Sequence, residues 1–239
     1  MTGSLSNRVI LVTGASRGIG RAAARALAAE GAHVIALART VGGLEELDDE
    51  IKAVGGTATL VPLDLKDFEA LDRLGASIFE RWQKLDGFLG NAGVLGVLTL
   101  LSHMQPKTFQ ELLDVNVTAN WRLIRSLDPL LKLSDAGRAV FVSSGVARSH
   151  RAFWGGYAMS KAALESLALT YAAECDTTNV RVNLLNPGST RTAMRAKAMP
   201  GEDPDTLPKP EDIAPLIVKM LSPSFSDNGT LVNYRDTKR

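Results

Sequence analysis

Tyr157 and Lys161, in the run GGYAMSKAALESL, are two residues whose types and spacing could do acid–base chemistry. Four residues is just over one helical turn, so both side chains project from one face of the helix that this run predicts. A free phenol has a pKa of about 10, and a nearby ammonium lowers that pKa by favouring the phenolate. The pair could therefore exchange a proton near neutral pH. Taken alone, however, the spacing more often marks a chance pair on an exposed helix face.

Length and composition favour one ordinary globular unit. The chain has 239 residues, 45% hydrophobic and 22% charged, which suits a single α/β domain over residues 1–239 with one continuous core. The 27 basic and 26 acidic residues leave a net charge of +1, so neither a nucleic-acid nor an anionic-membrane partner is expected. Cys175 is the one cysteine, and with three histidines it offers no zinc spacing, so no metal site is expected.

The first residues, MTGSLSNRVILVTG, contain a short apolar run that leads directly into a glycine turn. This pattern is typical of a first strand rather than a signal peptide. No apolar stretch approaches the length of a membrane span, so a cytoplasmic protein is expected.

Short apolar runs alternate with longer amphipathic runs along the whole chain. Runs that are continuously apolar and β-branched are typical of strands buried on both faces of a parallel sheet. Alternation of strands and helices predicts stacked βαβ units and a doubly wound α/β sheet. The expected strands are Arg8–Thr13, His33–Ala38, Thr59–Leu63, Asp86–Asn91, Arg138–Ser143, Val180–Asn186 and Thr230–Asn233. The expected helices are Arg21–Glu30, Leu44–Val54, Phe68–Trp82, Thr108–Leu131, Tyr157–Glu174 and Glu211–Leu221.

A glycine-rich turn, TGASRGIG, follows the first expected strand and opens the first expected helix. Gly14 permits a tight turn, Gly18 lets the backbone approach a pyrophosphate at the helix N-terminus, and Gly20 lets helix and strand pack closely. The spacing is GxxxGxG, and its place between strand and helix predicts a dinucleotide site. A plain glycine turn is the alternative.

The end of the second expected strand bears on the choice of nucleotide. An NAD-selecting enzyme is expected to carry an acid there to hold the ribose hydroxyls, but this chain has Ala38 and then Arg39. Arg39 and Arg17 offer two guanidinium groups that suit a 2′-phosphate, so NADP(H) is predicted over NAD(H). The alternative is that both are solvated surface charges. Asp64, after the third strand, is placed to accept from the adenine amine or simply to start a turn.

Several ordered motifs carry a family resemblance. They are the glycine turn, Asn91-Ala92-Gly93, Ser144, the Tyr157/Lys161 pair and Asn186-Pro187-Gly188. With these in order, residues 8 to 232 resemble the single-domain short-chain dehydrogenases/reductases. The run STRTAMRAKAMP is also similar to a bacterial subgroup of generic oxidoreductases in this family.

The resemblance implies roles for four catalytic residues. Tyr157 is the general acid for carbonyl reduction and the general base in reverse. Lys161 lowers the tyrosine pKa and hydrogen-bonds the nicotinamide ribose, and Ser144 polarises the substrate oxygen. Asn116, in DVNVTAN, holds a water against the lysine to complete a proton relay, with a helix-face polar residue as the alternative.

The resemblance also implies a Rossmann-type fold, with a seven-stranded parallel sheet flanked by helices on both faces. Asn91 ties strand four to the cofactor site, while Pro187, Gly188 and Thr192 cradle the nicotinamide. The full set expected to bind NADP(H) is Gly14, Ser16, Arg17, Gly18, Ile19, Gly20, Arg39, Asp64, Leu65, Asn91, Ala92, Gly93, Tyr157, Lys161, Pro187, Gly188 and Thr192.

Residues 190–210 are expected to form a substrate-lid loop, whose Pro200–Pro210 part reads as a mobile surface loop. Its cations could meet an anionic substrate or simply face solvent. Phe153 and Trp154 could line the pocket or serve ordinary packing. The cations of the expected lid are Arg191, Arg195 and Lys197.

A homodimer or homotetramer through helices 108–131 and 157–174 is expected. The short C-terminal run NGTLVNYRDTKR lacks the glycine-rich close common in tetrameric members, which weighs against the tetramer.

Together these features predict an NADP(H)-dependent oxidoreductase that interconverts a small-molecule carbonyl and an alcohol. Hydride transfer builds negative charge on oxygen, which two hydroxyl groups stabilise while the cofactor carries the hydride. A non-catalytic NADP(H)-binding or sensor protein is the alternative, although such a protein is expected to lose Tyr157 or Lys161. A sugar epimerase or dehydratase is expected to be longer, with an added substrate domain.

Overall fold

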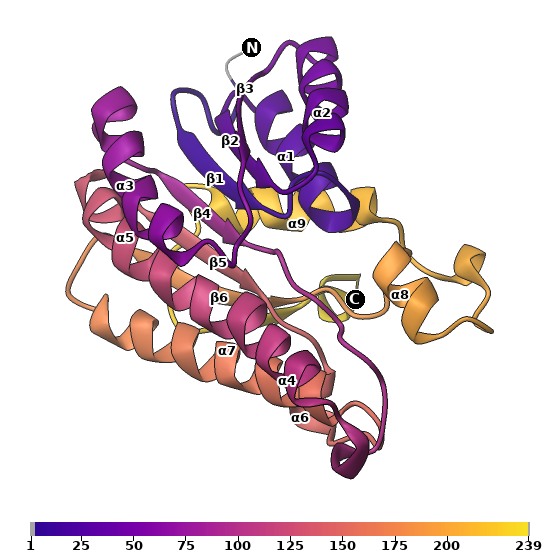
Figure 1. The fold of residues 1–239 in the computed structure, drawn as a ribbon. Coiled ribbons are helices and arrows are strands. Elements are labelled where there is room, and N and C mark those ends of the chain that lie inside the picture. Colours follow the sequence, from indigo (N-terminus) through magenta and orange to yellow (C-terminus); the bar gives the residue numbers. More distant parts are fainter. Residues whose placement is uncertain (1–2, 239) are drawn as a thin grey trace.

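The computed structural model describes residues 3–238 and contains within them one sheet of seven parallel strands in the order β3-β2-β1-β4-β5-β6-β7 (Figure 1). The order reverses between β1 and β4, where a crevice forms at the carboxyl ends of the strands. The prediction of a seven-stranded, doubly wound sheet is confirmed. The strands are β1 Val9–Thr13, β2 His33–Ala38, β3 Thr57–Pro62, β4 Gly87–Gly90, β5 Arg138–Val142, β6 Arg181–Asn186 and β7 Leu231–Asn233.

Helices connect the strands and cover both faces of the sheet (Figure 1). They are α1 Gly18–Ala29, α2 Val41–Ala53, α3 Phe68–Trp82, α4 Pro106–Leu113, α5 Ala119–Leu133, α6 Val146–Ser149, α7 Gly155–Glu174, α8 Ala193–Ala198 and α9 Pro210–Leu221. Short 3₁₀ turns lie at Leu101–His103, Pro204–Thr206 and Tyr234–Lys238.

The alternating side chains of β1 show how the sheet divides the core. Val9 and Leu11 pack with buried residues of α3, α5 and α7, whereas Ile10 and Val12 pack with α1, α2 and α9. Successive side chains of a strand point to opposite faces, so a strand that is apolar throughout requires cover on both sides. The two helical layers provide that cover and leave the strand ends free to carry polar groups.

Most predicted elements lie within three residues of the observed bounds, and α3 has the predicted bounds. The helix expected over 108–131 is wrong as a single regular helix, because α4 and α5 are joined by a π-helical turn, Asp114–Thr118. A π turn adds a residue to the helical ladder and turns its side chains to new directions, often at functional sites. The segment 190–210, expected to be a substrate-lid loop, contains α8 and a 3₁₀ turn.

A buried carboxylate holds the edge of the sheet opposite the crevice. Asp86, fully buried just before β4, accepts hydrogen bonds from Val9 N at 2.9 Å and from Ser134 Oγ at 2.6 Å. It also accepts from Lys84 Nζ at 2.9 Å and pairs with Arg8 at 3.6 Å. A buried carboxylate with this many partners ties β1, β4 and the end of α5 together.

Replacing Asp86 by alanine should lower the free energy of unfolding by roughly 3–5 kcal/mol, because it leaves the donors of Val9 N and Ser134 Oγ without this acceptor. It also leaves the buried Arg8 with Asp135 as its remaining acidic partner. Urea denaturation measures the change. Glu45→Ala, at an exposed position of α2, is the control and should change stability by at most about 0.5 kcal/mol. Equal stability of the two variants would show that the Asp86 network does not hold the edge.

Candidate active site

The glycine turn after β1 forms a backbone cradle. Gly14 has a φ of +67°, in the region that glycine adopts without strain. A Cβ at Gly20 would lie 2.3 Å from the Gly14 carbonyl oxygen, so any larger residue would push α1 away from β1. The predicted roles of these two glycines in turn and packing therefore have a clear steric basis.

The N-terminus of α1 is free to receive an anion. Its N-cap residue, Arg17, makes no side-chain capping hydrogen bond, and its first turn holds no acidic residue. By contrast, Asp67 caps α3 and Thr192 caps α8 through side-chain oxygens. The first N–H groups of a helix need acceptors, and a pyrophosphate provides them. The cradle thus fits the phosphate portion of a dinucleotide.

Asn91, which follows β4, joins this strand to the end of β1. Its Nδ2 donates to the Thr13 carbonyl at 2.9 Å, and its backbone N–H donates to Thr13 Oγ1 at 3.0 Å. Ala92 N donates to the same hydroxyl at 3.1 Å. Thr13, which sequence reasoning did not single out, is therefore the centre of this connection between β1 and β4.

The corner expected to hold the adenosine carries two cations and one acid. Arg17 is exposed, and within residues 3–238 its guanidinium has no ion-pair partner. Arg39, 57% exposed, lies 3.7 Å from Asp64, which is longer than a hydrogen bond. Asp64 also accepts from Lys66 N at 3.0 Å, so one of its oxygens initiates a turn. The turn-starting role of Asp64 is thus observed, and its second oxygen faces Arg39.

Three of the four expected catalytic residues converge where β5 ends. Ser144 follows β5, and Tyr157 and Lys161 lie on the same face of α7, both buried. Lys161 Nζ lies 5.9 Å from the centre of the Tyr157 ring and donates to the Val142 carbonyl at 2.8 Å. The pair is therefore not a chance pair on a solvated helix face.

Burial dominates the electrostatics of this pair. It raises the pKa of Tyr157 to about 12, while a hydrogen bond with Ser144 acts in the opposite direction. Burial also lowers the pKa of Lys161 to about 8, partly offset by the negative charge of Glu165. Both shifts favour the neutral forms, because a charge is costly away from water. The lowered tyrosine pKa expected from the sequence is thus not present in the protein alone.

The Lys161 ammonium has more hydrogen-bond donors than its one recorded acceptor uses. An ammonium carries three N–H donors, and one of them is used by Val142. A Cβ at Gly93 would lie 3.5 Å from Lys161 Nζ, so the absence of a side chain there keeps room beside the ammonium. Two buried donors next to an open backbone fit the ribose hydroxyls of a nicotinamide nucleotide.

Asn116 lies in the π turn and is fully buried, which excludes the exposed helix-face alternative. Its Oδ1 accepts from Val94 N at 2.8 Å, and its Nδ2 donates to the Val94 carbonyl and to Ser160 Oγ, each at 2.9 Å. Both amide donors are therefore engaged. Asn116 fastens the segment after β4 to α7 next to Lys161.

Residues after β6 face the glycine turn. A Cβ at Gly18 would lie 3.5 Å from the Thr192 methyl group, so the two segments approach across the crevice. Pro187 is buried, and Gly188 is exposed with a φ of +70°. The remaining expected cofactor residues follow the carboxyl ends of parallel strands: Ser16 and Ile19 after β1, Leu65 after β3, and Ala92 after β4.

A cavity of about 400 Å³ lies beside Ser144 and extends to Gly188 and to the chain after β7. Trp154 lines it and packs against Tyr157 with ring centres 6.3 Å apart, whereas Phe153 is 55% exposed. Only Trp154 thus fulfils the expectation that these aromatic residues line the pocket.

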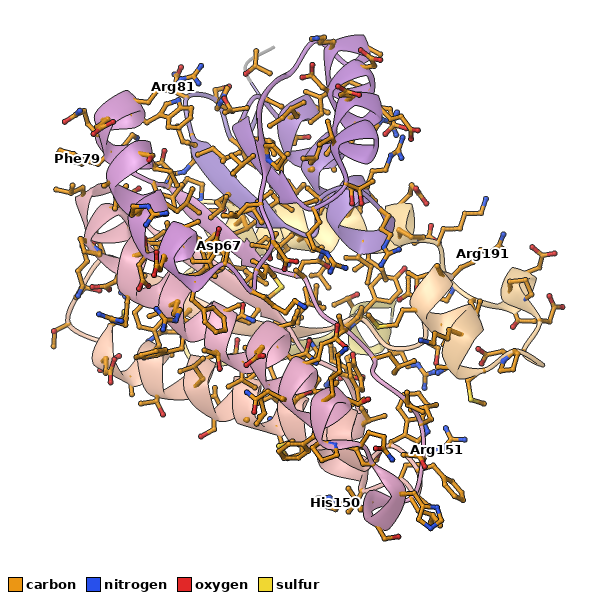
Figure 2. All side chains as sticks on the ribbon, viewed as in Figure 1. Asp67, Phe79, Arg81, His150, Arg151 and Arg191 are labelled. Atoms are coloured by element: carbon orange, nitrogen blue, oxygen red, sulfur yellow. The ribbon has the colours of Figure 1, made fainter. Side chains whose placement is uncertain are left out.

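Two of the three lid cations are already paired. Arg191 donates to Asp205 at 2.7 Å, and Arg195 forms two hydrogen bonds to Glu202 at 2.5 and 2.6 Å. Figure 2 shows Arg191 at the edge of the α8 segment. Both ion pairs join residues within the same segment, 190–210.

Glu165 was missed by sequence reasoning. It is buried, accepts from Ser143 Oγ at 2.6 Å and from Arg148 Nε at 2.9 Å, and lies one turn beyond Lys161. The i, i+4 spacing of Tyr157, Lys161 and Glu165 was the signal that could have found it.

Residues 3–238 show neither a metal-binding cluster nor a membrane-spanning helix. No group of three or more His, Cys, Asp or Glu side chains there could hold a metal ion. In that same range, no helix combines the length and apolar character needed to cross a membrane.

Known proteins resemble this chain over most of its length. The family model described as short chain dehydrogenase matches residues 8–203. YciK, an uncharacterized oxidoreductase of Escherichia coli K12, is 44% identical over 220 residues, which are 91% of this chain and 87% of YciK.

Two solved structures have nearly the same fold, and both are 41% identical to this chain. A short chain dehydrogenase from Shigella flexneri 2a strain 301, complexed with NADP, matches 98% of this chain and 100% of its own with a TM-score of 0.94. A short chain dehydrogenase from E. coli CFT073, complexed with NADPH, matches 98% of this chain and 99% of its own with a TM-score of 0.92. With its Rossmann-type sheet and its ordered motifs, the chain belongs to the short chain dehydrogenase family.

Proposed function

We propose that this protein is an NADP(H)-dependent oxidoreductase that interconverts a carbonyl compound and an alcohol. The observation that carries the proposal is the contact between the Tyr157 phenol and Ser144 beside a cavity, with buried Lys161 on the same helix face. The NADP and NADPH complexes of two structural neighbours support the choice of cofactor. A non-catalytic nucleotide-binding role is less consistent with an intact set of Ser144, Tyr157 and Lys161.

Each residue has a role set by its chemistry. The nicotinamide cofactor, when bound, supplies or accepts the hydride. Ser144 and Tyr157 hydroxyls would donate hydrogen bonds to the substrate oxygen, which gains negative charge during reduction, and Tyr157 would deliver the proton. In the reverse direction the phenolate would accept that proton. The cavity beside Ser144 would position the substrate.

Lys161 would hold the ribose hydroxyls with its two remaining donors. Its positive charge, if kept by those contacts, would favour the phenolate and oppose the rise in tyrosine pKa that burial causes. Asn116 is proposed as a positioning residue, since its side chain fastens Val94 and Ser160 around Lys161. A relay water would then depend on the one Oδ1 lone pair that remains or on the backbone of the π turn.

The preference for NADP(H) rests on Arg17 and Arg39. Both are exposed at the corner where β1 and β2 end, and neither makes a hydrogen bond to an acid. A 2′-phosphate could take bidentate hydrogen bonds from either guanidinium.

We also propose a dimer through α4, α5 and α7, the helices over 108–131 and 157–174. Phe109 and Trp121 are 40% and 43% exposed on α4 and α5. Exposed aromatic side chains are enriched in protein interfaces.

Tyr157→Phe should lower kcat/KM for NADPH-dependent reduction of aldehydes or ketones by about 10²–10⁴-fold, because it removes the proton donor. Tyr171→Phe on the same helix is the matched control. Its hydroxyl donates to Asp128 at 3.0 Å, so it should lose about 1 kcal/mol of stability and keep its activity. Full activity in Tyr157→Phe would refute the proton-donor role.

Lys161→Met should move the rising limb of the pH–rate profile for alcohol oxidation to higher pH. Oxidation needs the phenolate, so its rate rises with pH through the tyrosine pKa. Without the ammonium, that pKa keeps the high value that burial sets, which is about 12 in the protein alone. Lys107→Met, at an exposed position on α4, is the control. An unchanged profile would argue against coupling of the two groups.

Arg39→Asp should weaken NADPH binding by about tenfold to a hundredfold, the equivalent of about 1.5–3 kcal/mol for a hydrogen bond to a charged group. NADH, which lacks the 2′-phosphate, is the internal control and should bind with similar or higher affinity. Calorimetric titration of both nucleotides gives the comparison. Tighter binding of NADH than NADPH by the unmodified protein would contradict the proposed preference.

A further inference from the structure

The cavity beside Ser144 is lined by more cations than the proposed reaction needs. Arg151, Arg195 and Arg235 border it, and Asp236 is the one acid in its wall. These residues come from three segments far apart in the chain: the loop before α7, the lid, and the turn after β7. Their charges are not equally available to a ligand.

Two of the four charged side chains are already engaged. Arg195 is held by two hydrogen bonds to Glu202, which neutralises it. Asp236 accepts from Asn233 Nδ2 at 3.1 Å, and Asn233 Oδ1 in turn accepts from Asn186 Nδ2 at 3.0 Å. This chain of contacts fastens the last turn to the end of β6.

Arg235 lies on that fastened turn, and its guanidinium has no ion-pair or hydrogen-bond partner within residues 3–238. A Cβ at Gly188 would lie 3.6 Å from Arg235 Nε, so the arginine passes directly over the backbone of the segment after β6. The turn therefore holds a free cation at the wall of the cavity.

Arg151 provides the second free cation. Its guanidinium lies 5.7 Å from the centre of the Trp154 ring and has no acidic partner in the described part of the chain. Trp154 is buried and packs against Tyr157, so Arg151 and the proposed catalytic tyrosine contact the same indole ring. Figure 2 shows Arg151 beside His150 near α6, well separated from Arg191.

We propose that Arg151 and Arg235 form an anion subsite that selects substrates carrying a carboxylate or phosphate group in addition to the reacting carbonyl or alcohol. The inference deepens the proposed oxidoreductase function and rests on it. Guanidinium groups bind both anions through paired N–H donors, and free cations in a shared cavity attract such groups. The lid cations expected from the sequence do not fill this role, because Arg191 and Arg195 pair with lid acids.

The test compares charged and neutral ligands of equal size. Calorimetry on the NADP⁺ complex should give at least about tenfold tighter binding of benzoate than benzamide and of terephthalate than terephthalamide, as charge-assisted hydrogen bonds require. Phenyl phosphate tests whether phosphate is preferred to carboxylate. In parallel, KM for 4-carboxybenzaldehyde should be lower than KM for 4-formylbenzamide.

Arg151→Gln and Arg235→Gln should each reduce the preference for the anion while leaving NADP⁺ affinity unchanged. Arg73→Gln, at an exposed position on α3, makes the same charge change away from the cavity and should leave the preference intact. Far-ultraviolet circular dichroism verifies that each variant is folded.

Three outcomes would overturn the subsite. They are equal affinity for anions and amides, no binding of any anion, and a preference that survives both substitutions. Weaker NADP⁺ binding in Arg235→Gln would also overturn it, since the arginine would then act on the cofactor.

A protein that reduces both aldehydes with equal KM keeps the proposed function and loses the subsite. One that binds the anions selectively but reduces no carbonyl compound keeps the subsite and loses the proposed function.

Discussion

The parallel order of the sheet brings the carboxyl ends of its strands to one edge, and every part of the candidate site is positioned by it. Groups distant in sequence reach the crevice only because the order reverses between β1 and β4. Thr13 and Asn91 join these two strands through side-chain hydrogen bonds. The buried network of Asp86 secures the opposite edge, so structural and chemical roles are separated along the strands.

Burial gives the site its electrostatic character. Tyr157 and Lys161 are both withdrawn from water, and burial shifts the pKa of each toward its neutral form, upward for the phenol and downward for the ammonium. The pKa values of groups buried in this way respond strongly to the charges of a bound nucleotide, because few waters screen those charges. Glu165, one turn below Lys161, is the protein's own counter-charge and acts against the neutralisation of the lysine.

The end of the chain contributes to the cavity wall. The turn after β7 is fastened to β6 through Asn186, Asn233 and Asp236, which leaves Arg235 free beside the cavity. Under the proposed function, substrate preference would then be set largely by segments outside the sheet, as is common where loops carry specificity on a rigid scaffold.

The sequence was enough to predict the parallel sheet, the glycine turn and the place of Tyr157 and Lys161 on one helix face, because periodicity and turn chemistry are local properties. It could not determine the π turn that buries Asn116, since that turn depends on contacts with Val94 and Ser160. Tertiary structure alone decided which cations stay free, because ion pairing depends on neighbours in space. It also decided the direction of the Tyr157 pKa shift, since desolvation depends on the whole surrounding fold.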